Sequence, residues 1–229
     1  AIATPAAQSA KQATDDIPII FSAVTDPVES ELVDSMKHPG GNVTGTSDLA
    51  PTKSQLQMFK QIDPNIKKIG ILYNTGENNS EVQIDEVKSL APDEGLEVIT
   101  VGISTINEIP QAVDSIIKKV DAIYTITDNM VASAINVVAQ KAVENNLITV
   151  GAEDSHVKGG ILITDGISYY ELGKQSAKMA QEILVNNKAP GELPSETSAN
   201  TKKVFNENTL KSLKLDENDE VFKTSEKIK

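Results

Sequence analysis

The sequence predicts an α/β fold built from parallel β-sheets that are flanked by helices. Short runs such as residues 68–73 and 121–126 are apolar on both faces, and segments with apolar residues at helical spacing alternate with them. Strands that are buried on both faces and joined by helices are typical of a parallel sheet covered on both sides. Polar residues follow several strands directly, as in open parallel sheets that bind ligands beyond the strand ends.

The expected strands share short apolar, β-branched runs that are bounded by turn-forming residues. They lie at residues 1–4, 18–24, 42–46, 68–73, 96–101, 121–126, 147–151 and 160–164. We expect residues 1–4 to be the end of a buried strand and residues 5–8 to form a turn of small residues.

The expected helices either carry apolar residues at helical spacing or begin at residues that open a helix, such as 25–28. They lie at residues 25–38 and 51–62, around Val82, Val87 and Leu90, and at residues 109–117, 131–144 and 171–186. Residues 187–200 are rich in Pro, Gly and Ser and are predicted to connect elements. The charged tail at residues 216–229 is predicted to be a surface helix or frayed.

The composition excludes several functional classes. The formal net charge of −12 argues against binding to nucleic acid or to an anionic membrane surface. There is no Cys and there are only two His, which excludes thiol catalysis and thiolate or His-rich metal sites. Aromatic residues make up 3% and Trp is absent, which disfavours a site built on aromatic platforms. We expect neither a cofactor nor a metal ion.

The motifs of common enzyme classes are missing from the sequence. No Gly-x-Gly-x-x-Gly or Walker-type motif follows a strand, and no Gly-x-Ser-x-Gly marks a nucleophile. His156 follows Ser155 directly, a spacing that forms no triad, and we interpret it as a surface loop residue. His38 is interpreted as complementing the dipole at the end of the helix before it.

Five motifs stand in order along the chain at or near strand ends. They are residues 20–28 (IFSAVTDPV), 39–48 (PGGNVTGTSD), 70–74 with 77–80 (GILYN, ENNS), 127–133 (TDNMVAS) and 165–173 (DGISYYELG). Together they closely resemble the substrate-binding lipoproteins of a family of ABC importers. The resemblance runs from residue 1 to about residue 215.

The resemblance implies a type I periplasmic-binding-protein fold with two α/β lobes, each a parallel sheet flanked by helices, joined by three crossing segments. It places residues 1–47 and 165–190 in lobe I and residues 48–164 and 191–229 in lobe II. In this family a strand–helix–strand–helix stretch of about 60 residues precedes the position of residue 1. Lobe I is therefore expected to be incomplete at its N-terminus.

The residues expected to bind a ligand follow strand ends and face the cleft between the lobes. They are Thr4, Pro5, Ala6, Ser22, Thr25, Asp26, Asn74, Glu77, Asn79, Ser80, Asp128, Asn129 and Glu153. Residues of these types also cap helices for stability alone, which is the alternative role at each position.

A zwitterionic amino acid needs hydrogen-bond donors for its carboxylate and an acidic partner for its ammonium. Asn79 and Ser80, at a helix start, are predicted to hold the carboxylate. Asp128, Glu77 or Asp26 could bind the ammonium, and Asp128 is the predicted partner. Sugars rank lower because the sugar-binding relatives usually stack rings on aromatic side chains. Members of the family bind tryptophan and related aromatic amino acids, so tryptophan or phenylalanine is the implied ligand.

These features predict an extracytoplasmic solute-binding receptor, a monomer, that passes an amino acid to ABC permease membrane subunits without catalysing a reaction. The resemblance implies a lipid-anchored or periplasmic protein. One alternative is a hydrolase or sugar-modifying enzyme on a Rossmann-like sheet, although we find no nucleophile–base pair. A ligand-sensing transcription regulator shares the fold, but no helix-turn-helix with a basic face is recognisable.

Overall fold

The computed structural model describes residues 1–228, whose contacts form two compact units made of separate chain segments. Unit 1 comprises Ala1–Leu49, Glu77–Val82 and Ile167–Asn200, and unit 2 comprises Ala50–Gly76, Gln83–Gly166 and the chain from Thr201 onward. The predicted lobes change instead at residues 47/48, 164/165 and 190/191, and they place residues 77–82 in lobe II. Each unit has its own β-sheet.

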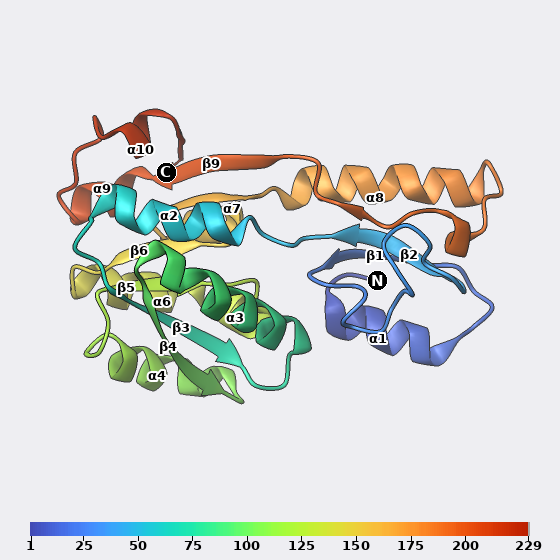
Figure 1. The fold of residues 1–229 in the computed structure, drawn as a ribbon, viewed down its shortest axis with the longest axis horizontal. Helices are drawn as coiled ribbons and strands as arrows, with labels where there is room; N and C mark the ends of the chain where they lie inside the picture. Colours follow the sequence, from blue (N-terminus) through green and yellow to red (C-terminus); the bar gives the residue numbers. More distant parts are fainter. Residues whose placement is uncertain (229) are drawn as a thin grey trace. The chain divides into compact units, whose positions relative to one another are not determined.

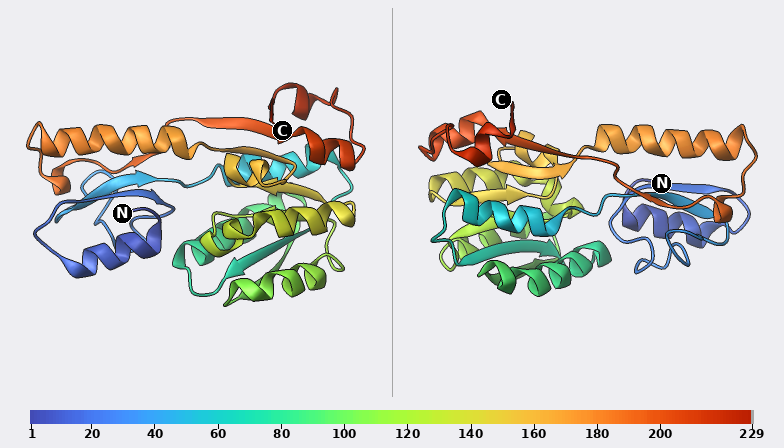
Figure 2. Two further views of the ribbon diagram at one scale, coloured as in Figure 1. Left: turned by 180° about the vertical axis from the view of Figure 1, so that it is seen from behind. Right: turned by 45° about the horizontal axis from the view of Figure 1, so that its top comes forward.

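Unit 1 contains a three-stranded parallel sheet of order β1-β2-β8 between two helices. Its strands are β1 (Ile19–Val24), β2 (Val43–Ser47) and β8 (Glu196–Thr197). Helices α1 (Thr4–Ala13) and α8 (Tyr169–Leu184) lie on opposite faces of the sheet, and the short 3-10 helix η3 (Pro190–Glu192) follows α8 (Figures 1 and 2). Successive side chains of β1 point to opposite faces of the sheet: Phe21 packs with Ala7 of α1, and Ile20 packs with Met179 of α8.

The start of unit 1 differs from the prediction. Pairing with β1 is limited to an isolated parallel bridge between Ile2 and Ser22, with hydrogen bonds from Ala1 to Ile20 and from Ala3 to Ser22, and Thr4 already begins α1. The predicted turn at residues 5–8 is therefore wrong. Pro5 lies in the first turn of α1, where its fixed φ suits a helix start and its missing N–H needs no partner.

The helix predicted at residues 25–38 is wrong as well, because this segment forms a series of turns. Asp26 Oδ1 accepts hydrogen bonds from the backbone N–H groups of Val28 and Glu29, both at 3.0 Å, which closes a local turn. Glu31 has a φ of 55°, a left-handed conformation that interrupts a right-handed helix. His38 consequently has no helix end to complement.

Unit 2 contains a seven-stranded sheet of order β10-β9-β7-β6-β5-β3-β4. Its strands are β3 (Lys68–Asn74), β4 (Glu97–Ile103), β5 (Ala122–Thr125), β6 (Ile148–Gly151), β7 (Ile163–Ile167), β9 (Thr201–Asn206) and β10 (Glu226–Ile228). The pairs β3–β4, β3–β5, β5–β6, β6–β7 and β9–β10 are parallel, which confirms the predicted parallel sheet.

Helices cover both faces of the unit 2 sheet. They are α2 (Thr52–Ile62), α3 (Asn78–Leu90), α4 (Ile109–Ile116), α5 (Asn129–Ser133), α6 (Ile135–Glu144), α7 (Asp154–Lys158), α9 (Glu207–Ser212), α10 (Glu220–Lys223) and the 3-10 helices η1 (Ala91–Glu94) and η2 (Ile106–Glu108). Ile71 of β3 joins one apolar core with Phe59, and the next residue, Leu72, joins a second core with Val113. The apolar pattern on both faces of the strands thus predicted their burial correctly.

Several elements of unit 2 depart from the prediction. The single helix expected at residues 131–144 is broken at Ala134 into α5 and α6, and the strand expected at residues 160–164 lies at β7. The segment predicted as a charged tail, residues 216–229, contains α10 and β10, and β10 joins the sheet. Lys229, the last residue of that segment, lies outside the described residues. Within residues 1–228, no helix combines the length and apolar character that a membrane crossing requires.

Candidate functional site

The carboxyl ends of three neighbouring strands gather polar side chains in unit 2. Asn74 ends β3, Asp128 follows β5 and Glu153 follows β6, and these strands are adjacent in the order β6-β5-β3. The backbone N–H of Asn74 donates to Asp128 Oδ2 at 2.6 Å. Three residues that the sequence predicted for the site therefore belong to one edge of one sheet, as expected for parallel strands.

Asp128 serves as a helix cap at this edge. Its Oδ1 accepts a hydrogen bond from the backbone N–H of Val131 at 2.8 Å, in the first turn of α5. Its Oδ2 holds Asn74, and its side chain is buried, with 1% exposed. Each carboxylate oxygen thus binds a backbone N–H. Asn129, the first residue of α5, is exposed.

Glu153 has a different environment, although it also precedes a helix. It occupies the N-cap position of α7 without forming a side-chain cap, and its Oε1 lies 2.9 Å from His156 Nε2. His156 Nδ1 lies 3.0 Å from the hydroxyl oxygen of Thr125 at the end of β5. The prediction that His156 is a surface loop residue is wrong, because only 1% of it is exposed.

Gly151 makes room for this buried pair. A Cβ atom at Gly151 would lie 2.9 Å from His156 Cβ and 3.2 Å from Thr125 Oγ1, closer than such atoms pack. A glycine at the end of β6, with a histidine five positions later, was the only signal of this arrangement in the sequence.

Further buried polar groups lie at the start of α3. This segment, Glu77–Val82, belongs to unit 1. Glu77, Asn79 and Ser80 are 5%, 2% and 0% exposed. Asn79 Nδ2 donates to Glu77 Oε2 at 3.3 Å, and the N–H of Ser80 donates to the Glu77 carbonyl at 3.1 Å. Such a cluster of amide donors at a helix start has the chemistry that binds a carboxylate.

A buried carboxylate also lies at the end of β2 in unit 1. Asp48 is 1% exposed, its Oδ1 accepts from the Thr25 hydroxyl at 3.1 Å, and its Oδ2 accepts from the Tyr169 hydroxyl at 3.1 Å. The sequence identified Thr25 as a site residue but not its partners. The sequence placed Asp48 and Tyr169 within two of the five motifs but assigned neither of them a role in the site.

The remaining predicted residues of unit 1 have mixed environments. Ser22 Oγ accepts from the Ser176 hydroxyl of α8 at 3.0 Å, which links β1 to that helix. Thr4 is buried at the start of α1, whereas Pro5 and Ala6 beside it are exposed. The carboxylate of Asp26 closes the turn described above, so its observed partners are backbone amides.

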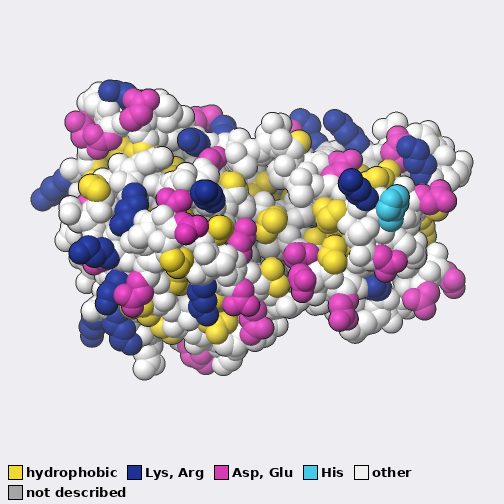
Figure 3. Space-filling model, viewed as in Figure 1, with side chains coloured by type: hydrophobic (Ala, Val, Ile, Leu, Met, Phe, Trp, Pro, Cys, Tyr) yellow, Lys and Arg dark blue, Asp and Glu magenta, His cyan; other side chains and the backbone are white. Residues whose placement is uncertain are grey.

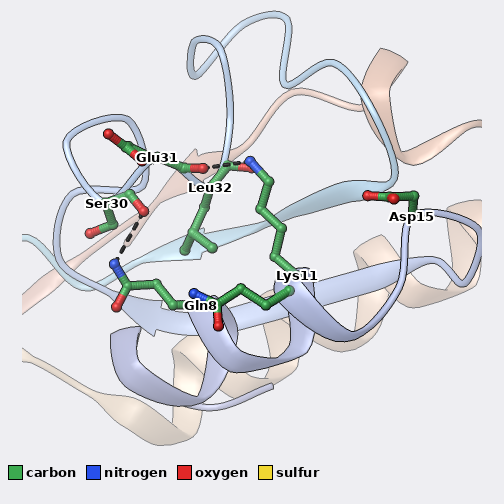
Figure 4. A pocket seen from close by; sticks show the side chains of 7 residues that line it. Gln8, Lys11, Asp15, Ser30, Glu31 and Leu32 are labelled. Carbon is green, nitrogen blue, oxygen red and sulfur yellow. Dashed lines mark hydrogen bonds between the residues drawn. The ribbon is translucent and has the colours of Figure 1, made fainter.

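A surface pocket of about 290 Å³ lies between α1 and the turn that follows β1 (Figure 4). Lys11 Nζ donates to the carbonyl of Glu31 at 2.5 Å, and Gln8 Nε2 donates to the carbonyl of Ser30 at 3.3 Å. These hydrogen bonds connect α1 to the turn, so we interpret the polar side chains that line the pocket as stabilising the fold. Among residues 1–228 no group of three His, Asp or Glu side chains is placed to hold a metal ion.

Parallel sheets with helices on both faces, and polar groups collected at their strand ends, define an α/β ligand-binding protein of the type I periplasmic-binding-protein fold. Sugar-binding proteins at 15% identity share this fold alone. The chain belongs to the ABC transporter substrate binding protein family, whose model matches residues 1–229.

Three relatives are much more similar. The "Tyrosine-binding protein" of Clostridioides difficile is 43% identical over 215 residues, which cover 94% of this chain and 62% of that protein. The ABC domain in complex with L-Trp from Streptococcus pneumoniae matches with a TM-score of 0.94 and 35% identity, over 100% of this chain and 77% of that one. A conserved domain protein from Vibrio cholerae matches equally well, with a TM-score of 0.94, 36% identity and the same coverage. This chain thus spans about 62% of the length of its curated relative.

Proposed function

We propose that this chain is the solute-binding receptor of an ABC importer and that it binds an aromatic amino acid. The observation that carries the proposal is the 43% identity, over 94% of this chain, to a protein named for binding tyrosine. The L-Trp complex of the streptococcal relative supports the same ligand class. In this proposal the receptor is an extracytoplasmic monomer, lipid-anchored or periplasmic, and delivers its ligand to permease subunits.

In this proposal, the described residues provide the groups that a zwitterion needs. Asn79 and Ser80 are proposed to bind the carboxylate, because they are buried at the start of α3, where backbone N–H groups are concentrated. The buried acids Glu77, Asp128 and Glu153 are the candidates for the ammonium. The other predicted residues, from Thr4 to Asp26 with Asn74 and Asn129, are proposed to complete the site.

Isothermal titration calorimetry with tyrosine, tryptophan and phenylalanine tests the proposal. We expect saturable binding of at least one of them, no binding of glucose, and recovery of the amino acid unchanged after prolonged incubation. Chemical conversion of the ligand would favour the enzyme alternative. No binding of any amino acid would contradict the proposed ligand class.

A single substitution tests the carboxylate subsite. Ser80→Ala removes one hydroxyl donor but keeps the backbone N–H groups, so we expect a loss of about 1 kcal/mol in binding free energy, or about fivefold in affinity. Ser89→Ala is the matched control, since Ser89 lies exposed on the same helix and its hydroxyl donates to the Glu86 carbonyl. Equal affinities of the two variants would remove Ser80 from the site.

A further inference from the structure

The chain passes between the two units at several points, and two of these connections are held by hydrogen bonds at both ends. One runs from β2 to α2 and changes unit between Leu49 and Ala50. The other runs from β7 to α8 and changes unit between Gly166 and Ile167. Because each unit has its own sheet, any change in the orientation of the units is absorbed in such connections. The bonds at their ends therefore determine which residues can move.

In unit 2 the start of α2 is bonded to β7. The hydroxyl of Ser54 donates to Asp165 Oδ2 at 2.6 Å, and Gln55 Nε2 donates to the carbonyl of Asp165 at 2.8 Å. Thr52, the first residue of α2, donates through its hydroxyl to Glu86 Oε2 of α3 at 2.8 Å. Gln55, Thr52 and Asp165 are buried, so water competes little for these bonds. Both connections thus begin from a rigid polar network in unit 2.

In unit 1 the end of β2 is bonded to the start of α8. Tyr169, the first residue of α8, is half-buried and donates through its hydroxyl to Asp48 Oδ2 at 3.1 Å. Asp48 is 1% exposed, and its Oδ1 accepts from the Thr25 hydroxyl at 3.1 Å. The hydroxyl of Ser47 donates to the Thr25 carbonyl at 2.8 Å. The two connections that are joined in unit 2 are therefore joined again in unit 1.

Three residues of each connection lie between these two sets of bonds. They are residues 49–51 in the first connection and residues 166–168 in the second. Together with the bonds at both ends, the two segments form a closed ring. Closing a ring removes chain conformations, so each segment restricts the other.

We infer that Tyr169 is a positioning residue, because its hydroxyl bond to Asp48 closes this ring and limits the conformations of the two connections in the ligand-free receptor. The inference rests on the proposed function. It gives Tyr169 no contact with the ligand, and it deepens the proposal by naming a group that sets affinity from outside the site.

Loss of the Tyr169 hydroxyl would add conformations of the free protein that differ from the bound one. The apparent affinity of a receptor is reduced by the fraction of free protein that is competent to bind. The association rate constant falls with this fraction, whereas dissociation starts from the bound conformation and keeps its rate. An effect that acts through the connections is therefore equal for every ligand of the site.

Tyr169→Phe removes the hydroxyl and keeps the ring. In the ligand-free protein we expect hydrogen exchange to become about 10-fold faster in peptides that cover residues 166–168. Affinities for L-tyrosine, L-tryptophan and L-phenylalanine should fall by one common factor of about 3 to 10. Stopped-flow kinetics should show this loss in kon, with koff within about twofold of wild type. Tyr170→Phe, the same exchange at the next residue, which is 75% exposed, is the matched control and should behave like wild type.

A double-mutant cycle tests whether Tyr169 acts through Asp48. Asp48→Asn weakens the acceptor, so adding Tyr169→Phe to it should cost less affinity than Tyr169→Phe costs in the wild type. An equal cost would show that Tyr169 acts elsewhere and would overturn the inference. Urea unfolding identifies any variant that is not folded, and if Asp48→Asn does not fold, the exchange and kinetics of Tyr169→Phe decide alone.

The remaining outcomes are distinct. If the wild type binds and Tyr169→Phe shows unchanged exchange and affinity, the inference fails and the proposed function stands. A loss in koff, or one that differs among the three amino acids, would make Tyr169 a ligand contact and overturn its positioning role. If the wild type binds none of the aromatic amino acids, the proposed function fails, whereas the exchange measurement needs no ligand and still tests the bond.

Discussion

Tyr124 shows how a single buried polar group is satisfied in unit 2. Its hydroxyl donates to Gln55 Oε1 at 2.5 Å, and Gln55 Nε2 donates to the carbonyls of Ala152 and Asp165 at 3.1 and 2.8 Å. Burial of the ring, with the nearby charge of Glu86, raises the pKa of Tyr124 far above its usual range. One side chain from α2 thereby joins β5 to the chain after β6 and to β7.

The substitution Tyr124→Phe is expected to lower the free energy of unfolding at pH 7 and to reduce its loss at high pH. At pH 7 the variant should be less stable by about 1–3 kcal/mol, because Gln55 Oε1 loses its buried donor. A pKa raised on folding contributes stability below about pH 10, and this stability is lost as pH rises through the folded pKa. The variant should therefore lose less stability than wild type between pH 9 and pH 11.

Urea unfolding across this pH range measures both effects. Tyr170→Phe is the control, since Tyr170 is 75% exposed and should unfold like wild type at pH 7. A Tyr124→Phe protein as stable as wild type at pH 7 would show that the Gln55 contact is worth little.

For individual residues, the sequence predicted only the features that are determined by neighbouring residues in the chain. Asp128 was recognised at a strand end, and its capping geometry follows from its place before α5. The burial of His156 depended on Gly151 and Thr125, which belong to two different strands. Such long-range packing has no signature in the residues beside His156.

Among the elements, the end of β1 carries an unusual backbone conformation. Ala23 has a φ of 59°, and the pairing of β1 with β2 shifts register between Ser22 and Val24. An alanine in the left-handed region is strained by about 1–2 kcal/mol, and such strain is found most often at functional sites. The two neighbours Ser22 and Thr25 were both predicted to bind the ligand.

Relief of this strain gives an element-scale prediction. Ala23→Gly should raise the free energy of unfolding by about 0.5 kcal/mol, because glycine adopts this φ without a Cβ clash. Ala10→Gly, in the interior of α1, should lower it by about 1 kcal/mol. Thermal unfolding compares the variants, and a loss in Ala23→Gly as large as that in Ala10→Gly would argue against strain at residue 23.

Elements with a regular apolar pattern were predicted well, and those with local exceptions were not. Strands β3, β5 and β6 and helices α2 and α4 lie close to their predicted ranges. β9 was missed because its first three residues, Thr201 to Lys203, are exposed and polar and only the last three are buried. The residues that open the predicted helix after β1 instead form turns, because Asp26 binds the nearby backbone N–H groups and Glu31 has a left-handed conformation.

For the whole molecule, the −12 charge does not create separate acidic and basic regions on the face drawn in Figure 3. Lys and acidic side chains are interspersed over the described residues in that view. This distribution gives no basic surface there for a polyanion, in agreement with a small-molecule ligand. The fold class followed from the sequence because strands buried on both faces leave few alternatives to a covered parallel sheet.

Ligand binding should be visible as a change in stability of the whole chain. A ligand that binds only the folded state adds about 2.7 kcal/mol at a concentration 100-fold above its Kd. We therefore expect tyrosine or tryptophan to raise the unfolding midpoint in urea, with glucose at equal concentration as the control. A midpoint raised by glucose and unaffected by both amino acids would contradict the ligand class.

The order of strands in unit 2 has a consequence for synthesis on the ribosome. β9 lies beside β7, and β10 lies beside β9, yet both are translated after every other strand of that sheet. At about 5–20 residues per second, the outer edge of β7 stays uncovered for seconds while residues 168–206 are being made. During that interval the nascent chain exposes an apolar strand edge that can pair with other chains, so chaperone capture would be most useful at this stage of translation.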